Sequence, residues 1–329
     1  MHAITVTEAG GPEQLQWSEV DTPTPAAGEV LVKTIASGVN RADLLQRQGH
    51  YPPPKGISEV MGLEATGTVV ELGPGVTGIS EGDEVVCLLA GGGYAEYFVV
   101  PQGQCLALPK GVDAVTAAGI VEVAATVVSN MDHVGLKPGE TFLVHGGAGG
   151  IGTFAIQYAK ALGCKVITTA GNERKLEHCR QMGADLAIDY HDDWVAAVKE
   201  ATAGDDFPHK GVDVILDVMG AKYLEMNVDV LAIGGRQVTI GLQGGRKGTL
   251  DFGKLLNKRA TVTATSLRFR PLEQKAEICQ RVAEVVWPMI ADGRIKTSPE
   301  TRIPLPEARR AHEQLDGGDN VGKIILVAP

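Results

Sequence analysis

His145-Gly146-Gly147-Ala148-Gly149-Gly150-Ile151-Gly152 is the stretch of sequence that decides the fold. It satisfies the spacing G-x-G-x-x-G, follows a short apolar run and opens an amphipathic helical pattern that ends at Gly163. In that context the motif predicts the phosphate-binding turn of a Rossmann-type βαβ unit. The alternative, a plain strand–helix turn, rarely needs five glycines within seven residues.

Short apolar runs and helical patterns alternate along the chain after this turn. The runs are rich in Val, Ile and Leu without clean alternation, which is typical of strands covered on both faces. The spacing leaves room for one crossover helix each, and this predicts a parallel, doubly wound α/β sheet. The predicted strands are Phe142–His145, Val166–Ala170, Leu186–Tyr190, Val212–Asp217, Gln237–Ile240 and Val262–Thr265.

The first 120 residues have a different pattern. Short alternating runs at 30–35, 67–72, 83–88 and 95–100 are separated by Gly/Pro-rich turns, which predicts a compact antiparallel β domain with few helices. The tail carries a predicted helix, Leu272–Ala291, and a last strand, Lys323–Val327. A strand at the end of the chain needs a sheet to join, so we expect it in the β-rich domain, with the dinucleotide unit inserted between that domain's two halves.

Composition excludes several functional classes. The 329 residues carry a net charge of −10 with 44% hydrophobic and 21% charged residues, which suits two globular domains and argues against a nucleic-acid partner. The start of the chain has no signal-peptide pattern and no run is long enough to span a membrane. Five scattered cysteines without a CxxC pair fit a reduced compartment, so we expect a cytoplasmic protein.

The tip of the second predicted strand distinguishes the two nicotinamide dinucleotides. NAD sites usually place an acid there to bind the ribose 2′-hydroxyl. This chain has Ala170-Gly171-Asn172, with Arg174 and Lys175 just beyond. Cations favour a 2′-phosphate, so the sequence predicts NADP(H), although Glu173 weakens the argument and both cations are compatible with a solvated helix start.

Several further motifs run along the chain. They are Gly38–Gly49 with Tyr51–Pro54, Gly62–Gly67, Glu71–Gly75, Gly91–Ala95 and Asn320–Ile324. With these motifs the chain resembles the medium-chain dehydrogenase/reductase superfamily. Within it, the chain is similar to the zinc-free NADPH:quinone oxidoreductases of the zeta-crystallin-like group, in the branch of the p53-inducible quinone reductases. One departure is the run Val121–Val128, whose small side chains replace a bulkier stretch in relatives and should change the shape of the acceptor pocket.

The resemblance implies a Rossmann domain, 120–266, inserted into a GroES-like β-rich domain, 1–119 and 267–329. It also implies at least a homodimer and possibly a tetramer. Residues expected along the cofactor are Asn40, Thr126, Gly147, Gly149, Gly150, Ile151, Gly152, Gly171, Lys175, Tyr190, Gly241, Leu242, Thr265, Ser266, Leu267 and Asn320.

The resemblance also implies that no metal is bound. Asn40 and Leu63 stand where zinc dehydrogenases of the superfamily have Cys and His ligands, and the lobe of four cysteines is missing. Glu64 and Glu122 alone are a poor zinc site, because catalytic zinc needs three protein ligands. Without that Lewis acid, reduction of an activated acceptor is a better match than alcohol oxidation.

These considerations predict hydride transfer from NADPH to a quinone or a similar electron-poor small molecule. Asn40 is expected to stabilise the developing oxyanion, and Tyr51 to donate a proton or hold the oxygen. Asn40 can instead be a turn residue bonded to its own backbone, and Tyr51 can instead pack on Pro52–Pro54. The alternative functions are an NADPH-dependent enoyl or enone reductase and a crystallin-like NADPH-binding protein with little catalysis.

Overall fold

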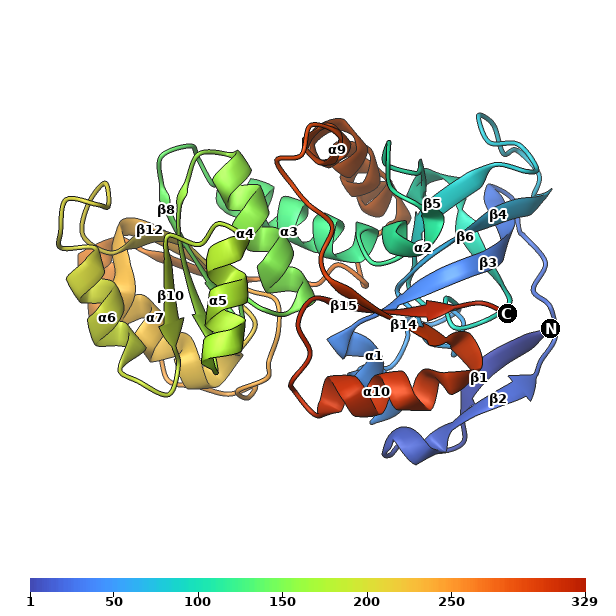
Figure 1. The fold of residues 1–329 in the computed structure, drawn as a ribbon, viewed down its shortest axis with the longest axis horizontal. Coiled ribbons are helices and arrows are strands. Elements are labelled where there is room, and N and C mark those ends of the chain that lie inside the picture. Colours follow the sequence, from blue (N-terminus) through green and yellow to red (C-terminus); the bar gives the residue numbers. More distant parts are fainter. The chain divides into compact units, whose positions relative to one another are not determined.

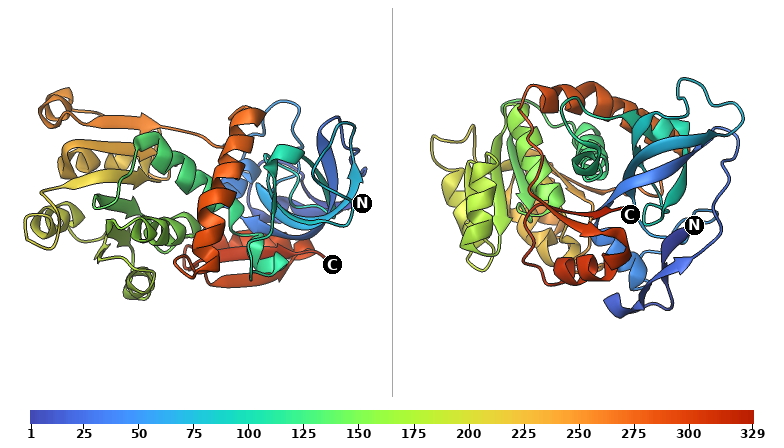
Figure 2. Two further views of the ribbon diagram at one scale, coloured as in Figure 1. Left: turned by 90° about the horizontal axis from the view of Figure 1, so that it is seen from above. Right: turned by 45° about the vertical axis from the view of Figure 1, so that its right-hand side comes forward.

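The computed structural model describes residues 1–329, which divide by their internal contacts into two compact units. Unit 1 comprises Met1–Ala125, Leu267–Gly293 and Thr297–Pro329, and unit 2 comprises Thr126–Ser266 and Arg294–Lys296. The first boundary lies six residues later than the predicted 119/120, within helix α3 (Val121–Val134). Both ends of the chain lie in unit 1 (Figure 2).

Unit 2 is built on one parallel sheet of six strands in the order β10-β9-β8-β11-β12-β13. The chain begins in the middle of the sheet, builds one half, and then returns to build the other half, which is the Rossmann order. The predicted doubly wound sheet is confirmed. The strands are β8 (Thr141–His145), β9 (Lys165–Ala170), β10 (Leu186–Asp189), β11 (Val212–Asp217), β12 (Leu231–Thr239) and β13 (Thr261–Ala264).

Helices cover this sheet (Figure 1). They are α4 (Gly150–Ala161), α5 (Glu173–Gln181), α6 (Trp194–Ala201), α7 (Leu224–Val230) and α8 (Phe252–Lys258), with a 3-10 turn at Gly220–Tyr223. Helix α4 follows the predicted apolar stripe, and Phe154, Ala155 and Tyr158 are buried. Gly163 follows its C-cap, Leu162, and has a φ of +85°, the left-handed conformation expected after a helix.

Unit 1 contains a seven-stranded sheet in the order β14-β15-β3-β4-β5-β7, with β6 also pairing with β3, and a separate pair, β1 and β2. The strands are β1 (His2–Val6), β2 (Leu15–Glu19), β3 (Glu29–Val39), β4 (Glu64–Leu72), β5 (Glu84–Leu88), β6 (Tyr97–Pro101), β7 (Cys105–Ala107), β14 (Glu300–Pro304) and β15 (Lys323–Val327). The C-terminal strand β15 joins this sheet, as predicted, and lies antiparallel to β3 (Figure 1). Its other neighbour, β14, is parallel to it, so the sheet is not purely antiparallel.

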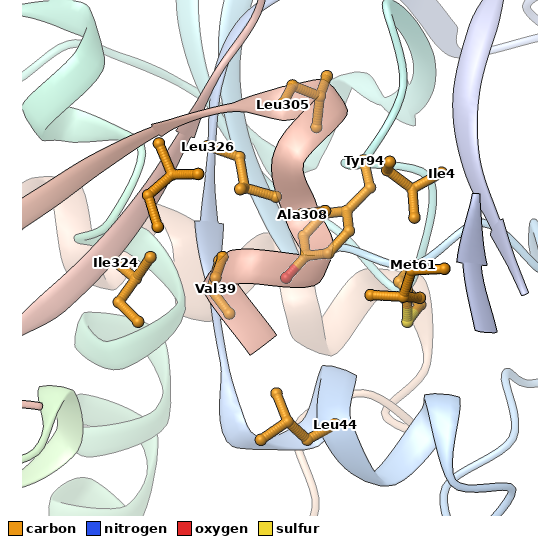
Figure 3. Close-up of a cluster of buried hydrophobic side chains, with 12 residues drawn as sticks. Ile4, Val39, Leu44, Met61, Tyr94, Leu305, Ala308, Ile324 and Leu326 are labelled. Atoms are coloured by element: carbon orange, nitrogen blue, oxygen red, sulfur yellow. The ribbon is translucent and has the colours of Figure 1, made fainter. Parts of the chain in front are cut away.

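The helices of unit 1 are α1 (Arg41–Arg47), α2 (Ala114–Ala117), α9 (Leu272–Ala291) and α10 (Ala308–Asp316), with 3-10 turns at Pro12–Gln14, Gln102–Gln104 and Leu305–Glu307. Figure 3 shows one of the cores of this unit, in which side chains from β1, β3, α1, α10 and β15 surround the fully buried Tyr94. This core ties the C-terminal segment to the N-terminal strands.

No helix in the structure combines the length and the apolar character needed to cross a bilayer.

Candidate functional site

The glycine turn of unit 2 has no room for side chains at two of its positions. A Cβ atom at Gly147 would overlap the side chain of Thr168, and one at Gly152 would lie 2.5 Å from the Cα of Gly147. Gly149 differs, since the nearest neighbour of its Cβ would be 3.5 Å away. The turn is therefore closed on its inner side and open at Gly149, as a cradle for a pyrophosphate requires.

Helix α4 begins at this open position. Gly149 is its N-cap and provides no side-chain hydrogen bond, and the first intrahelical donor is the N–H of Thr153, 2.8 Å from the Gly149 carbonyl oxygen. The preceding N–H groups at 150–152 thus have no helical acceptor. Together with the positive end of the helix dipole they suit an anion.

His145, at the start of the motif, is buried among polar and aromatic side chains of unit 2. Its Nε2 lies 2.8 Å from Asn227 Oδ1 and its Nδ1 lies 3.0 Å from Thr169 Oγ1, which assigns the proton to Nε2. The ring packs edge-on against Trp194 and Tyr223. Burial lowers its pKa to about 4, so the imidazole is neutral at physiological pH.

Arg174 and Lys175 lie just beyond the carboxyl end of β9, in the first turn of α5. Asn172 caps α5 by accepting from the N–H of Lys175 at 3.0 Å. The carboxylate of Glu173 pairs with Arg180 at 2.6 Å, and this cation offsets its negative charge. Arg174 is exposed and forms no ion pair. Glu173, the acid that counts against NADP(H), therefore already has a cationic partner in Arg180.

Tyr190 directly follows β10 and lies against the same tip. A Cβ atom at Gly171 would overlap the phenol of Tyr190, so only glycine allows this close approach. The ring is 44% exposed and stacks at a tilt on His191 with centroids 4.5 Å apart. An exposed aromatic face beside the strand tip is available to a flat base.

The remaining predicted cofactor residues of unit 2 gather at strand ends or on α3. Gly241 follows β12 and packs so closely on Val218 that a Cβ atom would lie 2.7 Å from its carbonyl oxygen. Leu242 is 52% exposed. Thr265 donates to Asn130 at 2.6 Å, and Asn130 in turn donates to the carbonyl of Thr126 at 2.7 Å. Ser266 is exposed.

In unit 1, Asn40 belongs to a buried triad with Glu64 and Lys323. The Nζ of Lys323 donates to Asn40 Oδ1 and to Glu64 Oε1, both at 2.6 Å, and Asn40 Nδ2 donates to Glu64 Oε1 at 3.0 Å. The other Glu64 oxygen accepts the N–H of Glu122 at 2.9 Å. The second N–H of the Asn40 amide has only a 3.4 Å contact, to the carbonyl of Gly38. The amide orientation is therefore fixed by a charge on each side.

A second polar chain lies behind Asn40. Asp43 accepts from the N–H of Asn40 at 2.8 Å and from the Tyr94 hydroxyl at 3.2 Å. His312 lies 3.4 Å from that hydroxyl, and Arg47 lies 3.2 Å from the other ring nitrogen of His312. Burial raises the pKa of Asp43 to about 6, against hydrogen bonds that lower it. The chain holds the start of α1 in place.

Tyr51 is held by residues far from the neighbouring Pro52–Pro54 in the sequence. Its ring packs edge-on against Phe269 with centroids 5.5 Å apart, and the guanidinium of Arg268 lies 5.1 Å from its centroid. Arg268 also donates to the Tyr51 carbonyl at 3.1 Å. Residues more than 200 positions away in the sequence therefore hold this tyrosine.

The structure thus sorts the predicted residues into two sets. Asn40, Tyr51, Leu267 and Asn320 belong to unit 1, and the others belong to unit 2. Asn320 accepts from Gln314 at 3.2 Å and donates to the Gly322 carbonyl at 3.1 Å. Sequence reasoning missed Lys323 and Arg268. No local spacing links them to Asn40 or Tyr51, and their only signal was a charge within an apolar segment.

Comparison with known protein families is consistent with this architecture. Residues 26–110 match the alcohol dehydrogenase GroES-like domain, which confirms the predicted identity of the β-rich fold. Residues 150–283 match a family described as zinc-binding dehydrogenase. The described residues contain no group of three His, Cys, Asp or Glu side chains able to hold a metal ion.

Individual relatives align along the whole chain. Quinone oxidoreductase 1 of Escherichia coli is 33% identical over 97% of each chain. A 2-haloacrylate reductase of a Burkholderia species is 31% identical, covering 99% of this chain and 98% of the relative.

Solved structures give the same result. The E. coli quinone oxidoreductase in complex with NADPH superimposes with a TM-score of 0.88 at 34% identity, covering 99% of this chain and all of that one. A mycobacterial protein in complex with NADPH superimposes with a TM-score of 0.89, also at 34% identity and with the same coverage.

Proposed function

Because the chain belongs to the medium-chain dehydrogenase/reductase superfamily, among homologues of its quinone oxidoreductases, we propose that it is an NADPH-dependent, zinc-independent reductase of a quinone or a similar electron-poor acceptor. The acceptor takes up a hydride and a proton, so that a quinone becomes a hydroquinone while NADPH becomes NADP⁺. The placement in the p53-inducible branch remains a prediction.

The residues of unit 2 fit this cofactor. The open glycine turn and the free N–H groups of α4 would hold the pyrophosphate, and Arg174 and Lys175 would face the 2′-phosphate. Tyr190 and the residues after β12 and β13, with Thr126, would line the rest of the dinucleotide. When bound, NADPH supplies the hydride at its nicotinamide ring. Two structural neighbours that superimpose along the whole chain carry NADPH, which supports the assignment.

The observation that carries the zinc-independent reading is the Asn40–Glu64–Lys323 triad. A metal at this place would need ligands from positions 40 and 63, which are an amide and an aliphatic side chain. The adjacent carboxylate, Glu64, already has a cation 2.6 Å away in Lys323. The donor set therefore suits an internal ion pair and not a Zn²⁺ ion.

We assign the acceptor chemistry to two residues of unit 1. Asn40 retains one N–H that is not engaged by Glu64, and we assign it to the oxygen on which negative charge develops. Tyr51, held by Arg268 and Phe269, is assigned as proton donor or oxygen clamp. Since Asn40 and Tyr51 lie in unit 1, we infer that unit 1 binds the acceptor and unit 2 the cofactor.

The test is an acceptor panel with NADPH and NADH in parallel, on protein whose metal content is measured. We expect turnover of 1,4-benzoquinone-type acceptors with NADPH and less than one zinc per ten chains. An NADH preference would contradict the cofactor assignment, and stoichiometric zinc with alcohol oxidation would contradict the reductase. NADPH binding without turnover of any acceptor would favour the crystallin-like alternative.

The enoyl or enone reductase remains the second candidate, because one relative is named a 2-haloacrylate reductase and so acts on a conjugated acid. Including 2-alkenals and acrylates in the panel separates the two: a higher kcat/KM for these than for quinones would favour it. We also propose a homodimer, which analytical ultracentrifugation would test.

A further inference from the structure

Unit 1 contains two largely buried cations that form no ion pair. Arg268 and Lys275 are each only 4% exposed. Neither forms an ion pair with a carboxylate, and the nearby acids Glu273 and Glu277 are exposed and bind neither of them. A buried charge without a partner is costly, so natural proteins keep one where it serves a ligand or a reaction.

The hydrogen bonds that Arg268 donates all go to uncharged acceptors. Its Nε donates to the Ala90 carbonyl at 2.7 Å, and its Nη2 donates to Gln46 Oε1 at 2.7 Å. With the bond to the Tyr51 carbonyl, three of the five N–H groups are used and two remain. The guanidinium is held rigidly by neutral acceptors, and no carboxylate is in direct contact with it.

Lys275 has even fewer contacts. Its ammonium has no hydrogen-bond acceptor within the protein and lies where solvent reaches it, although the residue as a whole is only 4% exposed. Burial lowers the pKa of Lys275, and the positive charge of Arg268 lowers it further. Both cations belong to the segment that leads into α9: Arg268 lies four residues before its first residue, and Lys275 lies in its first turn.

The start of α9 adds positive potential to the same place. Lys275 sits in the first turn of this 20-residue helix, and helical side chains lean toward the N-terminus. The N-cap, Pro271, supplies no side-chain acceptor, so the first N–H groups of α9 are uncapped. The helix dipole and both side chains thus favour an anion together.

An exposed apolar surface borders these cations. The ring of Tyr51 covers Arg268, and Phe269 meets that ring edge-on while remaining 53% exposed. Leu272, in the first turn of α9, is 50% exposed. A flat conjugated molecule can lie on these side chains with a negative group directed at the buried cations.

We propose that Arg268 and Lys275 form an anion subsite beside Tyr51, and that the acceptor is a planar conjugated molecule bearing a carboxylate, sulfonate or similar fixed negative charge. This inference rests on the proposed reductase function and narrows its substrate class. Arg268 also positions Tyr51, whereas Lys275 has no other contact to maintain, so Lys275 is the residue to test.

The experiment compares 1,2-naphthoquinone with its 4-sulfonate at saturating NADPH. The sulfonate adds a fixed negative charge and also withdraws electrons from the ring, so the readout is how the ratio of kcat/KM values changes between wild type and variants. We expect the wild type to have a kcat/KM about tenfold or more higher for the sulfonate, the value of a charge-assisted hydrogen bond. Lys275→Met should lower that ratio about tenfold, through the kcat/KM for the sulfonate. Lys275→Arg should restore most of the ratio.

Two controls keep the result interpretable. Lys110→Met removes the same charge from an exposed position of unit 1 and should not change the ratio. Lys275→Met should not lower the melting temperature, because it breaks no hydrogen bond or ion pair and keeps an unbranched side chain of similar size. Lost discrimination in a protein of undiminished stability cannot be attributed to misfolding.

The outcomes separate this inference from the proposed function. If the wild type reduces neither quinone, the reductase itself is wrong. If it reduces both and Lys275→Met leaves the ratio unchanged, the reductase stands and the anion subsite is overturned. If Lys275→Met weakens NADPH binding by the same factor with both acceptors, the cations serve the cofactor and the inference is again overturned.

Discussion

The Nζ of Lys323 lies 2.6 Å from Glu64 Oε1, with the lysine side chain 6% exposed and the glutamate side chain fully buried. The two residues are 259 positions apart, on β15 and β4. The pair joins the last strand to the middle of the N-terminal sheet and, through Asn40, to the proposed acceptor site.

Removing either partner of this pair should destabilise unit 1. Lys323→Met or Glu64→Gln leaves a buried polar group or charge without its partner, which costs about 3–5 kcal/mol when a buried pair is broken. Urea unfolding of each variant measures the cost. The double variant should lose less than the sum of the two single losses, and simple additivity would mean that the two side chains do not interact.

Two glycines of the phosphate turn should respond differently to alanine. At Gly152 a Cβ atom would overlap the turn itself, so Gly152→Ala should destabilise unit 2 and abolish NADPH binding. At Gly149 the backbone φ of −78° suits alanine and the space is open. Gly149→Ala should therefore fold normally and still bind NADPH at least tenfold more weakly, because the methyl group occupies the place of the phosphate. Thermal melting and fluorescence titration with NADPH measure the two effects. Unchanged NADPH affinity in Gly149→Ala would place the pyrophosphate elsewhere.

The choice of dinucleotide should depend on the charges around α5. Arg174→Ala should lower kcat/KM for NADPH about tenfold and leave NADH unchanged, since only NADPH has the 2′-phosphate. Arg180→Ala tests the same idea indirectly. It frees the carboxylate of Glu173, which now pairs with Arg180 at 2.6 Å, and should weaken NADPH binding by a smaller factor. An equal loss with both cofactors would argue against a 2′-phosphate site here.

Tyr51→Phe separates chemistry from packing. The variant removes only the hydroxyl and keeps the ring that contacts Arg268 and Phe269. If the hydroxyl donates a proton, kcat should fall by about 10²-fold with KM for NADPH unchanged. Steady-state kinetics at several pH values is the measurement, and full activity of the phenylalanine variant would reduce Tyr51 to a packing residue.

The stability of unit 2 should depend on pH through His145. Burial holds its pKa at about 4 against 6.5 in an unfolded chain, so below pH 6.5 the unfolded chain binds a proton that the folded one does not. Stability should therefore fall as the pH drops, by up to about 3 kcal/mol by pH 4.

Comparison with His145→Gln isolates this effect from other titrating groups. The difference in unfolding free energy between wild type and variant should shrink by about 2 kcal/mol from pH 6.5 to pH 5. A difference that stays constant over this range would mean that His145 is charged in the folded protein. Asp43 in unit 1 acts in the opposite sense: its pKa is raised to about 6, so protonation favours folding there.

Much of the architecture could be predicted from local sequence. The limits of α9 and β15 agree with the predicted helix 272–291 and strand 323–327, because apolar periodicity and flanking Gly and Pro are local signals. Strand ends were less certain. The predicted run 237–240 extends one residue beyond the end of β12, Leu231–Thr239, and misses its earlier residues, which include two glycines that locally resemble a turn.

The candidate site divides in the same way. The glycines of the phosphate turn and the absence of an acid after Ala170 are local features that can be recognised in consecutive residues. The sequence alone therefore indicates that unit 2 suits a dinucleotide with a 2′-phosphate. Only the tertiary structure placed Lys323 on Glu64 and Asn40, and Arg268 on Tyr51, because these contacts join segments separated by more than 200 residues. Burial then decides their chemistry: the same lysine or arginine is an ordinary solvated cation on the surface and a positioned charge inside the fold.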